Sequence, residues 1–335
     1  MIDLRGKRIL FISPEFFGID KSIMHVLEEM GAKVQWFDER SIKSSFFRAI
    51  NSVCSHFFYF QSNNYYKKIC GEIKDDIDII LIIKGDMISR KTIELLRRRF
   101  KNVEIILYLY DSVRNINGIL NRVGLYDEVL SFDPKDCKEF GFEFRPLFCD
   151  FENKQKRKEK EVIYDICFYG TMYGDRFRIV NRVQEYCKRQ GMRFFSFCYL
   201  RGKFMALYYW ITEKEYRKMQ KGMISFKAKS TAEIEDIVAS SKIVLDANDV
   251  NQQGLTIRTL ETLMSGKKMI TTNKDITNYD FYNPNNILVV DRDNIQITEE
   301  FMESEYIEID PCILTKYSAE GWVEDVFKEM RTREV

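Results

Sequence analysis

The stretch SSKIVLDANDVNQQGLTIRTLETLMSGKKMITTN, residues 240–273, decides the fold of this chain. Its apolar run at 243–245 predicts a buried strand, and a polar loop at 246–254 follows. Leucines at helical spacing then predict a helix that ends at Gly266, a favourable C-terminal stop. A second apolar run at 269–270 completes a strand–loop–helix–strand unit. In such a unit the loop and the helix N-terminus lie at the carboxyl edge of the sheet, where ligands bind.

Two charged residues, Arg258 and Glu261, are three positions apart in this helix and therefore share a face. One interpretation is a surface ion pair. The other is a ligand site: a guanidinium suits a bidentate contact with a diphosphate, and a carboxylate accepts hydrogen bonds from ribose hydroxyls. The helix N-terminus adds free N–H groups and a positive dipole end. Together these groups predict a nucleotide-sugar site.

Residues 254–266, GLTIRTLETLMSG, contain the pattern R-x-x-E-x-x-x-x-G. They resemble the donor-site segment of GT-B glycosyltransferases, and within that group they are most similar to the CgeB-like branch of the group 1 enzymes. The resemblance implies that Glu261 holds the donor ribose and that Arg258 lies near the diphosphate. It implies that the donor is a nucleotide-diphosphate sugar and that no cofactor is required.

The resemblance also extends substrate binding to the loop before the helix, at Gln253, Gly254 and Thr256. Gln253 departs from the pattern, because the broader group often carries a glutamate at this position, eight residues before the ribose glutamate. Retaining enzymes often rely on that glutamate. The stereochemical outcome, retaining or inverting, therefore stays open.

A second segment of the same kind lies upstream, where a glycine-bearing turn at 170–174 joins a predicted strand to a predicted helix. Backbone N–H groups in such a turn suit phosphate. The sequence FYGT at 168–171 with Arg176 resembles the F-x-G-[ST]…R opening of the C-terminal domain in the CgeB-like family. This resemblance assigns Gly170, Thr171 and Arg176 to substrate binding.

Two shorter polar segments lie beside these motifs. Lys227 is near the end of a short strand predicted over 225–229, from which it is expected to approach the diphosphate. Residues 291–293, DRD, spell D-x-D, the metal signature of a different glycosyltransferase class. That class has a single domain with the motif mid-chain, so this segment is interpreted as a loop and no metal is expected.

Alternating apolar runs and helical patterns predict an α/β protein with two Rossmann-like, doubly wound domains. Residues 154–161, KQKRKEKE, form a charge run that is typical of a solvated linker. We expect an acceptor domain over 1–152 and a nucleotide-sugar donor domain over 153–317, facing a central cleft as in the GT-B fold. The resemblance implies that a final helix within 318–333 packs back on the first domain.

The first domain offers two candidate acids. Its first apolar run, at 8–12, leads into the loop at 14–18, which lacks a G-x-G-x-x-G pattern and so does not predict ordinary dinucleotide binding. Glu15 in this loop is either a substrate contact or a solvated loop acid. Asp111 follows a strand predicted over 104–109, so it lies at the ligand edge of that sheet. It is a candidate catalytic base for the acceptor hydroxyl, with helix N-capping as the alternative.

The composition is that of a soluble globular protein, with 335 residues, 45% hydrophobic, 31% charged and a net charge of +1. The balanced charge predicts no nucleic-acid partner. Eight scattered cysteines without C-x-x-C pairs, and no recognisable signal peptide, predict a cytoplasmic protein. The only histidines, His25 and His56, argue against a histidine-rich metal site or a His-centred triad.

Aromatic residues reach 14% of the chain and cluster in two basic segments, at 44–69 and 201–221. The first segment is interpreted either as a helix that rests on a membrane or as a core helix with an aromatic loop. The second is either a cover helix or another membrane contact. We therefore retain the inner face of the inner membrane as a candidate partner for peripheral association.

Three functions follow from these observations. The first is a glycosyltransferase that moves a sugar to a saccharide or lipid-linked acceptor in polysaccharide or lipopolysaccharide biosynthesis, with Arg258 stabilising the leaving diphosphate. The second is a non-catalytic nucleotide- or sugar-binding protein on the same scaffold, and the third is a nucleotide-sugar epimerase. Replacement of Arg258 or Glu261 is expected to weaken donor binding without unfolding the protein.

Overall fold

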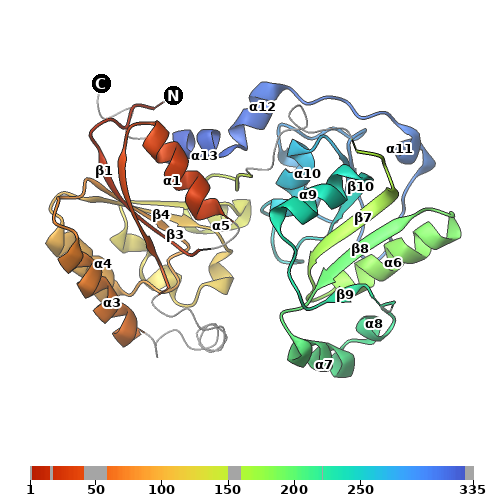
Figure 1. Ribbon diagram of the computed structural model, residues 1–335, viewed down its shortest axis with the longest axis horizontal. Helices are drawn as coiled ribbons and strands as arrows, with labels where there is room; N and C mark the ends of the chain where they lie inside the picture. The colour runs from red at the N-terminus through yellow and green to blue at the C-terminus, as the bar shows by residue number, and fades with distance from the viewer. Residues whose placement is uncertain (1, 16–17, 41–58, 150–159, 221, 329–335) are drawn as a thin grey trace. The chain divides into compact units, whose positions relative to one another are not determined.

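The computed structural model describes residues 2–15, 18–40, 59–149, 160–220 and 222–328 (Figure 1). The chain divides into two compact units, one formed by 1–148 with 316–335 and the other by 149–315. Each unit contains one six-stranded parallel sheet with flanking helices. Every helix in the described ranges is too short or too polar to cross a bilayer.

Unit 1 has the strand order β2-β1-β3-β4-β5-β6. Its strands are β1 (Arg8–Ser13), β2 (Lys33–Asp38), β3 (Ile79–Ile83), β4 (Glu104–Leu109), β5 (Glu128–Ser131) and β6 (Glu143–Phe144). Its helices are α1 (Ile19–Glu29), α3 (Tyr59–Glu72), α4 (Arg90–Arg99), α5 (Pro134–Phe140) and α13 (Ala319–Val326), with 3₁₀ turns at Val113–Asn115, Ile119–Asn121 and Val123–Leu125. Because β2 and β3 lie on opposite sides of β1, the strand order reverses there.

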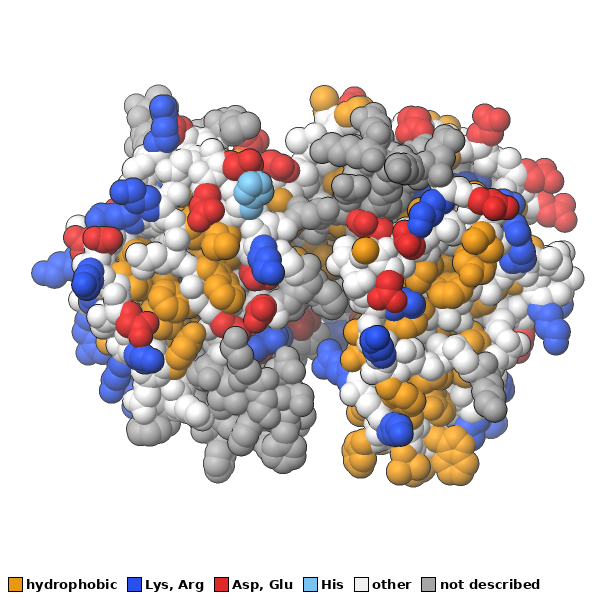
Figure 2. All heavy atoms as spheres, in the orientation of Figure 1, with side chains coloured by type: hydrophobic (Ala, Val, Ile, Leu, Met, Phe, Trp, Pro, Cys, Tyr) orange, Lys and Arg blue, Asp and Glu red, His pale blue; other side chains and the backbone are white. Residues whose placement is uncertain are grey.

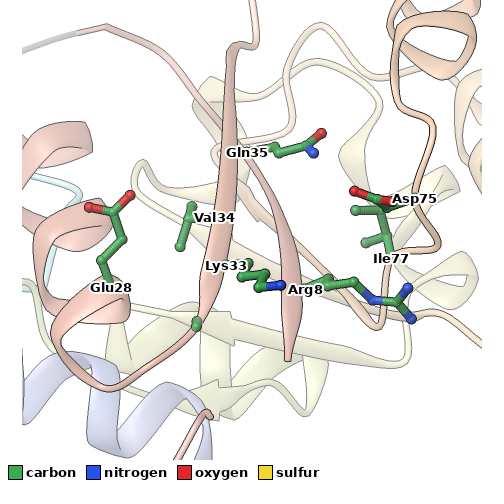
Figure 3. Close-up of a pocket in the computed structure, with 8 residues that line it drawn as sticks. Arg8, Glu28, Lys33, Val34, Gln35, Asp75 and Ile77 are labelled. Carbon is green, nitrogen blue, oxygen red and sulfur yellow. The ribbon is translucent and has the colours of Figure 1, made fainter. Parts of the chain in front are cut away.

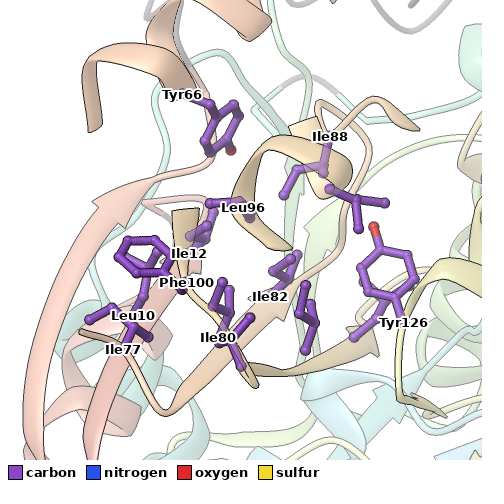
Figure 4. Packing of buried hydrophobic residues seen from close by; sticks show 14 of the residues in the cluster. Leu10, Ile12, Tyr66, Ile77, Ile80, Ile82, Ile88, Leu96, Phe100 and Tyr126 are labelled. Atoms are coloured by element: carbon purple, nitrogen blue, oxygen red, sulfur yellow. The ribbon is translucent and has the colours of Figure 1, made fainter. Parts of the chain in front are cut away.

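The core of unit 1 forms where continuous apolar strands meet amphipathic helices (Figure 4). All five residues of β3 are buried, as expected for a parallel strand covered on both faces. Leu96 in α4 and Phe100 at its C-terminus belong to the buried cluster that packs on the sheet. Helix α4 begins after Ser89, whose Oγ accepts a hydrogen bond from the Thr92 N–H at 3.1 Å. Ser89 is therefore the N-cap of α4.

The last helix, α13, belongs to unit 1, where the resemblance placed it. It lies beside α1 (Figure 1). Trp322 is fully buried, and its ring centroid lies 4.8 Å from that of Tyr108 and 5.3 Å from that of Phe148. Asp325 adds an ion pair with Arg145 at 3.2 Å. The C-terminal segment therefore completes the core of the first unit.

Unit 2 has the strand order β12-β11-β10-β7-β8-β9. Its strands are β7 (Tyr164–Thr171), β8 (Phe194–Tyr199), β9 (Ile224–Ser225), β10 (Ser241–Asp246), β11 (Lys268–Thr271) and β12 (Ile287–Val289). Its helices are α6 (Arg176–Arg189), α7 (Lys203–Thr212), α8 (Lys214–Arg217), α9 (Thr231–Ala239), α10 (Ile257–Met264), α11 (Glu299–Glu303) and α12 (Pro311–Lys316), with a 3₁₀ turn at Lys274–Asn278. The strand–loop–helix–strand unit predicted over 240–273 is present as β10, α10 and β11.

The sheet of unit 2 opens at the point where its strand order reverses. β8 and β10 lie on opposite sides of β7, so the reversal falls between β7 and β10. Pairing between these two strands ends at Val244 and Cys167, whereas β7 continues to pair with β8 as far as Thr171. Ligands of open parallel sheets bind at the carboxyl ends of strands at such a reversal.

Some local features differ from the sequence prediction or were absent from it. The N-cap of α9 is Ser230, which has extended backbone angles and forms a reciprocal capping box with Glu233. Strand β9 contains only two residues, so Lys227 lies beyond it. Helix α5 was not predicted from the sequence, although Asp133 caps it and a proline occupies its first turn.

Candidate functional site

The side chain of Arg258 occupies the opening between β7 and β10. Its Nε donates to the Tyr169 carbonyl at 2.7 Å, and its Nη1 donates to Asp246 Oδ1 at 3.0 Å. The Arg258 side chain is 8% exposed and that of Asp246 is 0% exposed, so this is a buried ion pair. Within the part of the chain that the structure describes, Nη2 of Arg258 makes no hydrogen bond. Through Nε and Nη1 the guanidinium therefore bridges the ends of β7 and β10, and Nη2 remains available for a ligand.

Asp246, the last residue of β10, holds this arrangement together. Besides the Arg258 guanidinium, its carboxylate accepts hydrogen bonds from the hydroxyls of Thr256, Thr259 and Thr271 at 2.9, 3.1 and 3.1 Å. The Thr256 hydroxyl also accepts from the Thr259 N–H, which makes Thr256 the N-cap of α10. Asp246 thus ties the start of α10 to the ends of two strands. Sequence reasoning placed Asp246 only in a polar loop.

Gly170 is required at the end of β7 because the Arg258 guanidinium lies against its backbone. A Cβ at Gly170 would be 2.1 Å from Arg258 Nη2, far inside van der Waals contact. The residue also has φ +148°, a conformation that favours glycine. The free Nη2 of Arg258 therefore lies at the carboxyl end of β7, next to the turn that the sequence assigned to phosphate.

We expect Gly170→Ala to displace the Arg258 guanidinium and to weaken binding of a nucleoside diphosphate at least ~10-fold, the loss of about one charge-assisted hydrogen bond. Gly174→Ala is the matched control, because Gly174 has φ +54° in the same turn but a methyl group there would meet nothing within 4 Å. It should cost only the ~1 kcal/mol of left-handed backbone strain. Isothermal calorimetry on both variants is the measurement, and equal affinities would remove the role of this contact.

Arg176 contributes a second guanidinium to the same edge. Its Nε donates to the Ala247 carbonyl at 2.7 Å and its Nη1 to the Thr171 carbonyl at 2.8 Å, and its guanidinium carbon lies 4.0 Å from the Tyr173 ring centroid. Burial, and then the charge of Arg258, lower the pKa of Arg176 to about 10, so it stays protonated at neutral pH. In the described ranges no carboxylate forms an ion pair with Arg176. An anion bound there would supply the missing countercharge.

Glu261 lies one turn along α10 and meets the same strand. Its Oε2 accepts a hydrogen bond from the Tyr169 hydroxyl at 2.6 Å, while Oε1 has no partner among residues 160–220 and 222–328. Burial is the main cause that raises the pKa of Glu261, and the hydrogen bond from Tyr169 opposes it. Tyr169 thus joins the two charged residues, with its carbonyl on Arg258 and its hydroxyl on Glu261. The partner of Arg258 is Asp246, so the alternative of a surface pair between Arg258 and Glu261 is wrong.

The other predicted residues of this segment lie in the loop between β10 and α10. Gly254 is buried, and its carbonyl accepts from Gln252 Nε2 at 3.0 Å. Gln253 is exposed, and its carbonyl accepts from Asn273 Nδ2 at 2.9 Å. The structure therefore brings this loop to the same sheet edge as Arg258 and leaves the Gln253 side chain accessible.

Lys227 lies elsewhere along the edge. It follows β9, which is separated from β7 by β8. At the usual strand spacing this places its backbone about 10 Å from the end of β7. Its side chain is exposed. The structure does not bring Lys227 together with Arg258 and Arg176, and its contact with a diphosphate stays a prediction.

The D-x-D segment forms a loop after β12, as predicted. Asp291 Oδ1 accepts from the backbone N–H groups of Asp293 and Asn294 at 2.8 and 3.2 Å. Asp293 pairs with Arg178 at 2.9 Å, and Asp291 with Lys274 at 3.4 Å. Both carboxylates are therefore engaged by cations of the chain. The described residues contain no group of three or more His, Cys, Asp or Glu side chains arranged to hold a metal ion.

In unit 1, Asp111 follows β4 at the carboxyl edge. Its Oδ1 accepts from the Ser112 N–H at 3.0 Å and from Asn115 Nδ2 at 2.7 Å, and its Oδ2 lies 4.0 Å from Lys84 Nζ. These contacts do not make Asp111 a helix N-cap, because the N-cap of the following 3₁₀ turn is Ser112. The capping alternative is therefore wrong, and the Asp111 side chain is 38% exposed. Glu15 is an exposed residue shortly after β1. Both acids lie at the ends of strands, and both keep their roles only as predictions.

Two further acids of unit 1 were missed. Glu39 follows β2, is fully buried, and accepts from the Met87 N–H at 2.9 Å through Oε1. Burial, and then the nearby charge of Asp86, raise the pKa of Glu39. Asp86 follows β3 and lies 3.4 Å from Lys84 Nζ. The sequence does contain a signal for them, because Glu39 and Asp86 each follow an apolar run, as acids at the carboxyl ends of strands do.

Unit 1 has a pocket whose lining includes Arg8, Glu28 and Asp75 (Figure 3). Arg8 and Lys33, which line it, are the first residues of β1 and β2. It therefore lies at the amino ends of the strands, opposite the edge at which parallel sheets bind ligands. We do not assign it to the candidate site.

Most of the aromatic segment at 44–69 lies outside the described residues, which exclude 41–58. Within α3, Tyr66 is fully buried and Ile69 is 2% exposed, and both belong to the core of unit 1. For these two residues the core-helix interpretation is confirmed, whereas Lys67 and Lys68 on the same helix are exposed.

No protein-family model matches the chain, and no curated protein matches it in sequence. Solved structures do resemble it. The catalytic domain of starch synthase IV from Arabidopsis thaliana, bound to ADP and acarbose, has a TM-score of 0.59 at 8% identity, covering 98% of this chain and 99% of that one. A UDP-GlcNAc 2-epimerase from Methanocaldococcus jannaschii, in complex with UDP-GlcNAc and UDP, has a TM-score of 0.56 at 12% identity, covering 97% and 99%.

The lipopolysaccharide outer core galactosyltransferase WaaB in its apo form has a TM-score of 0.51 at 12% identity, covering 96% of this chain and 99% of that one. At such identities the likeness is one of fold. Because each of these likenesses covers nearly the whole chain, it includes both units and both six-stranded sheets. The chain therefore has the two-domain α/β architecture of the GT-B glycosyltransferases.

Proposed function

We propose that this chain is a glycosyltransferase that moves a sugar from a nucleotide-diphosphate sugar to a saccharide or lipid-linked acceptor. The observation that carries the proposal is a pair of polar atoms around Tyr169, Nη2 of Arg258 and Oε1 of Glu261, which have no hydrogen-bond partner among the described residues. They lie where the strand order of unit 2 reverses, which is the ligand edge of such sheets. The proposed setting is the cytoplasm, in the assembly of a cell-surface polysaccharide.

The two atoms match the two polar parts of a nucleotide-sugar carrier. The diphosphate accepts hydrogen bonds from Arg258, from the second guanidinium on Arg176 and from backbone N–H groups at the start of α10. The ribose hydroxyls donate to Glu261. Gly170, Thr171, Gln253, Gly254 and Thr256 supply the backbone and loop surface around them. Two of the similar structures, the starch synthase and the epimerase, are described with bound nucleotides, which supports this placement.

In the transfer reaction the bond between the anomeric carbon and the diphosphate oxygen breaks, and a bond to the acceptor oxygen forms. Negative charge develops on the leaving diphosphate, where preorganised cations are most effective. Arg258 and Arg176 are preorganised, because each is held by backbone carbonyls. The acceptor hydroxyl loses its proton to a base, for which Asp111 is the proposed group.

An assay with purified protein and a panel of nucleotide sugars tests this proposal. We expect release of nucleoside diphosphate to depend on an added saccharide or lipid-linked acceptor and to persist in a chelator, since no metal is assigned a role. An epimerase is favoured if the nucleotide sugar changes configuration, by proton NMR, without an acceptor. Binding without turnover in any acceptor mixture would indicate the non-catalytic alternative, which the departure at Gln253 favours slightly.

A further inference from the structure

Helix α7 carries apolar residues around its whole circumference, and only one side of it is used by the fold. Tyr209 points into the core of unit 2, where its ring centroid lies 4.9 Å from that of Phe177. Met205 and Ala206 pack beside it against the same core. A helix that is apolar on all sides is normally buried on all sides. In α7 one face packs against the core of unit 2, and the opposite face is exposed.

The remaining face is strongly exposed. At 100° per residue, Phe204, Leu207, Tyr208 and Ile211 fall on the side away from Tyr209. The exposed large side chains of this helix are Phe204 at 82%, Leu207 at 55%, Tyr208 at 51%, Trp210 at 57% and Ile211 at 65%. Figure 2 shows hydrophobic side chains gathered over α7. A contiguous exposed patch of this kind marks an interaction surface.

Cations surround this face. Residues 201–218 contain five basic and two acidic residues. Lys203, the first residue of α7, and Lys214, two positions beyond its end, are exposed. Arg217 donates to the Trp210 carbonyl at 2.7 Å, near the C-terminal end of α7. One of the two acids, Glu215, is already paired with Lys218 at 2.6 Å. The rim of the apolar face therefore carries an excess of positive charge.

We propose that α7 docks unit 2 on an anionic phospholipid surface, with Phe204, Leu207 and Ile211 in the interface and the basic rim at the headgroups. Phe, Leu and Trp on one face with Lys and Arg beside them are the composition of interfacial membrane helices, and Tyr and Trp prefer the headgroup level. A protein partner fits less well, because protein interfaces are depleted in lysine. Each basic residue near an anionic surface adds to the attraction.

This surface is separate from the proposed donor site. α7 follows β8, whereas Arg258 and Glu261 lie on α10 beyond β10. The inference therefore does not rest on the transferase assignment. It would place an enzyme of lipid-linked acceptors where such acceptors are found. The test measures membrane binding and not activity, so the two proposals can fail independently.

The test is co-sedimentation of the whole protein with vesicles at low salt. We expect binding to vesicles of phosphatidylglycerol and phosphatidylcholine, at least tenfold weaker binding to phosphatidylcholine alone, and tenfold weaker binding of Phe204→Ser/Ile211→Ser to the anionic vesicles. Leu120→Ser/Ile307→Ser is the matched control, because those side chains are 43% and 44% exposed elsewhere. It should bind like the unchanged protein. Lys203→Glu/Lys214→Glu should lose the preference for anionic lipid.

Trp210 provides a second readout at the surface itself. Trp322 is fully buried and Trp36 is partly buried, so Trp210 is the exposed indole of the chain. Its emission should shift to the blue on addition of anionic vesicles, and Trp210→Phe should bind without that shift. Absence of co-sedimentation, or equal binding of the Phe204→Ser/Ile211→Ser variant and its control, overturns the proposal. A dimer that this variant dissociates would overturn it in favour of a second copy of the chain.

Discussion

Arg258→Met is expected to lower the free energy of unfolding by about 3–5 kcal/mol, the cost of breaking a buried ion pair by removing one partner. Asp246 is fully buried, and its remaining partners are three threonine hydroxyls, which do not neutralise its charge. The variant also removes the Nε donor that satisfies the Tyr169 carbonyl between β7 and β10. Urea denaturation at neutral pH measures the change.

Two further variants separate the buried charge from other effects. Arg189→Met removes an exposed arginine from the last turn of α6 and should stay within about 0.5 kcal/mol of the unchanged protein. Arg258→Met/Asp246→Asn removes both charges, and we expect it to recover much of the loss, because neutral replacements of buried pairs are often tolerated. If Arg258→Met denatures like Arg189→Met, the buried ion pair has no structural role.

This expectation changes one prediction made from the sequence, that an Arg258 variant binds donor weakly but folds normally. The spacing of Arg258 and Glu261 on one helix is local, so the sequence was sufficient to place them together. The partner of Arg258 was not predictable in the same way. Asp246 is twelve positions earlier, and it becomes the partner only because parallel pairing brings the ends of β10 and β11 beside α10. Burial of this kind depends on tertiary register.

The same distinction applies to other parts of the fold. Strands such as β4 and β10 were predicted because apolar runs specify buried parallel strands without information from elsewhere. Helix α7 is also apolar throughout, but its sequence does not say which residues the core of unit 2 accepts. Glu39 could not be recognised as buried, because its contacts with Met87 and Asp86 join segments nearly 50 residues apart. Local sequence patterns were sufficient to predict the helices and strands, whereas the burial and partners of residues at strand ends depend on tertiary packing.

Glu261→Gln is expected to remove most of the preference of the donor site for ribose over 2′-deoxyribose. The nucleoside diphosphate that binds best in a panel is compared with its 2′-deoxy form by calorimetry. A hydrogen bond to a charged group contributes about 1.5–3 kcal/mol, so the unchanged protein should bind the ribonucleotide about 10-fold or more tightly. In the variant an amide oxygen replaces the charged acceptor, and the ratio should fall to a few-fold. Glu185→Gln, an exposed acid on α6, is the control.

Because the pKa of Glu261 is raised, the same variant should also gain stability while it loses the preference for ribose. Because burial raises the folded pKa above the ordinary value of 4.5, folding favours the protonated carboxyl. Its contribution to stability is complete below pH 4.5 and is lost as the pH rises through the folded pKa. Glu261→Gln should therefore gain stability relative to the unchanged protein at pH 7.5 and lose that advantage near pH 4. The ribose preference of the unchanged protein should fall over the same window on acidification. A variant that is more stable yet no longer distinguishes ribose would assign Glu261 to the ligand, whereas an unchanged ribose preference would exclude it.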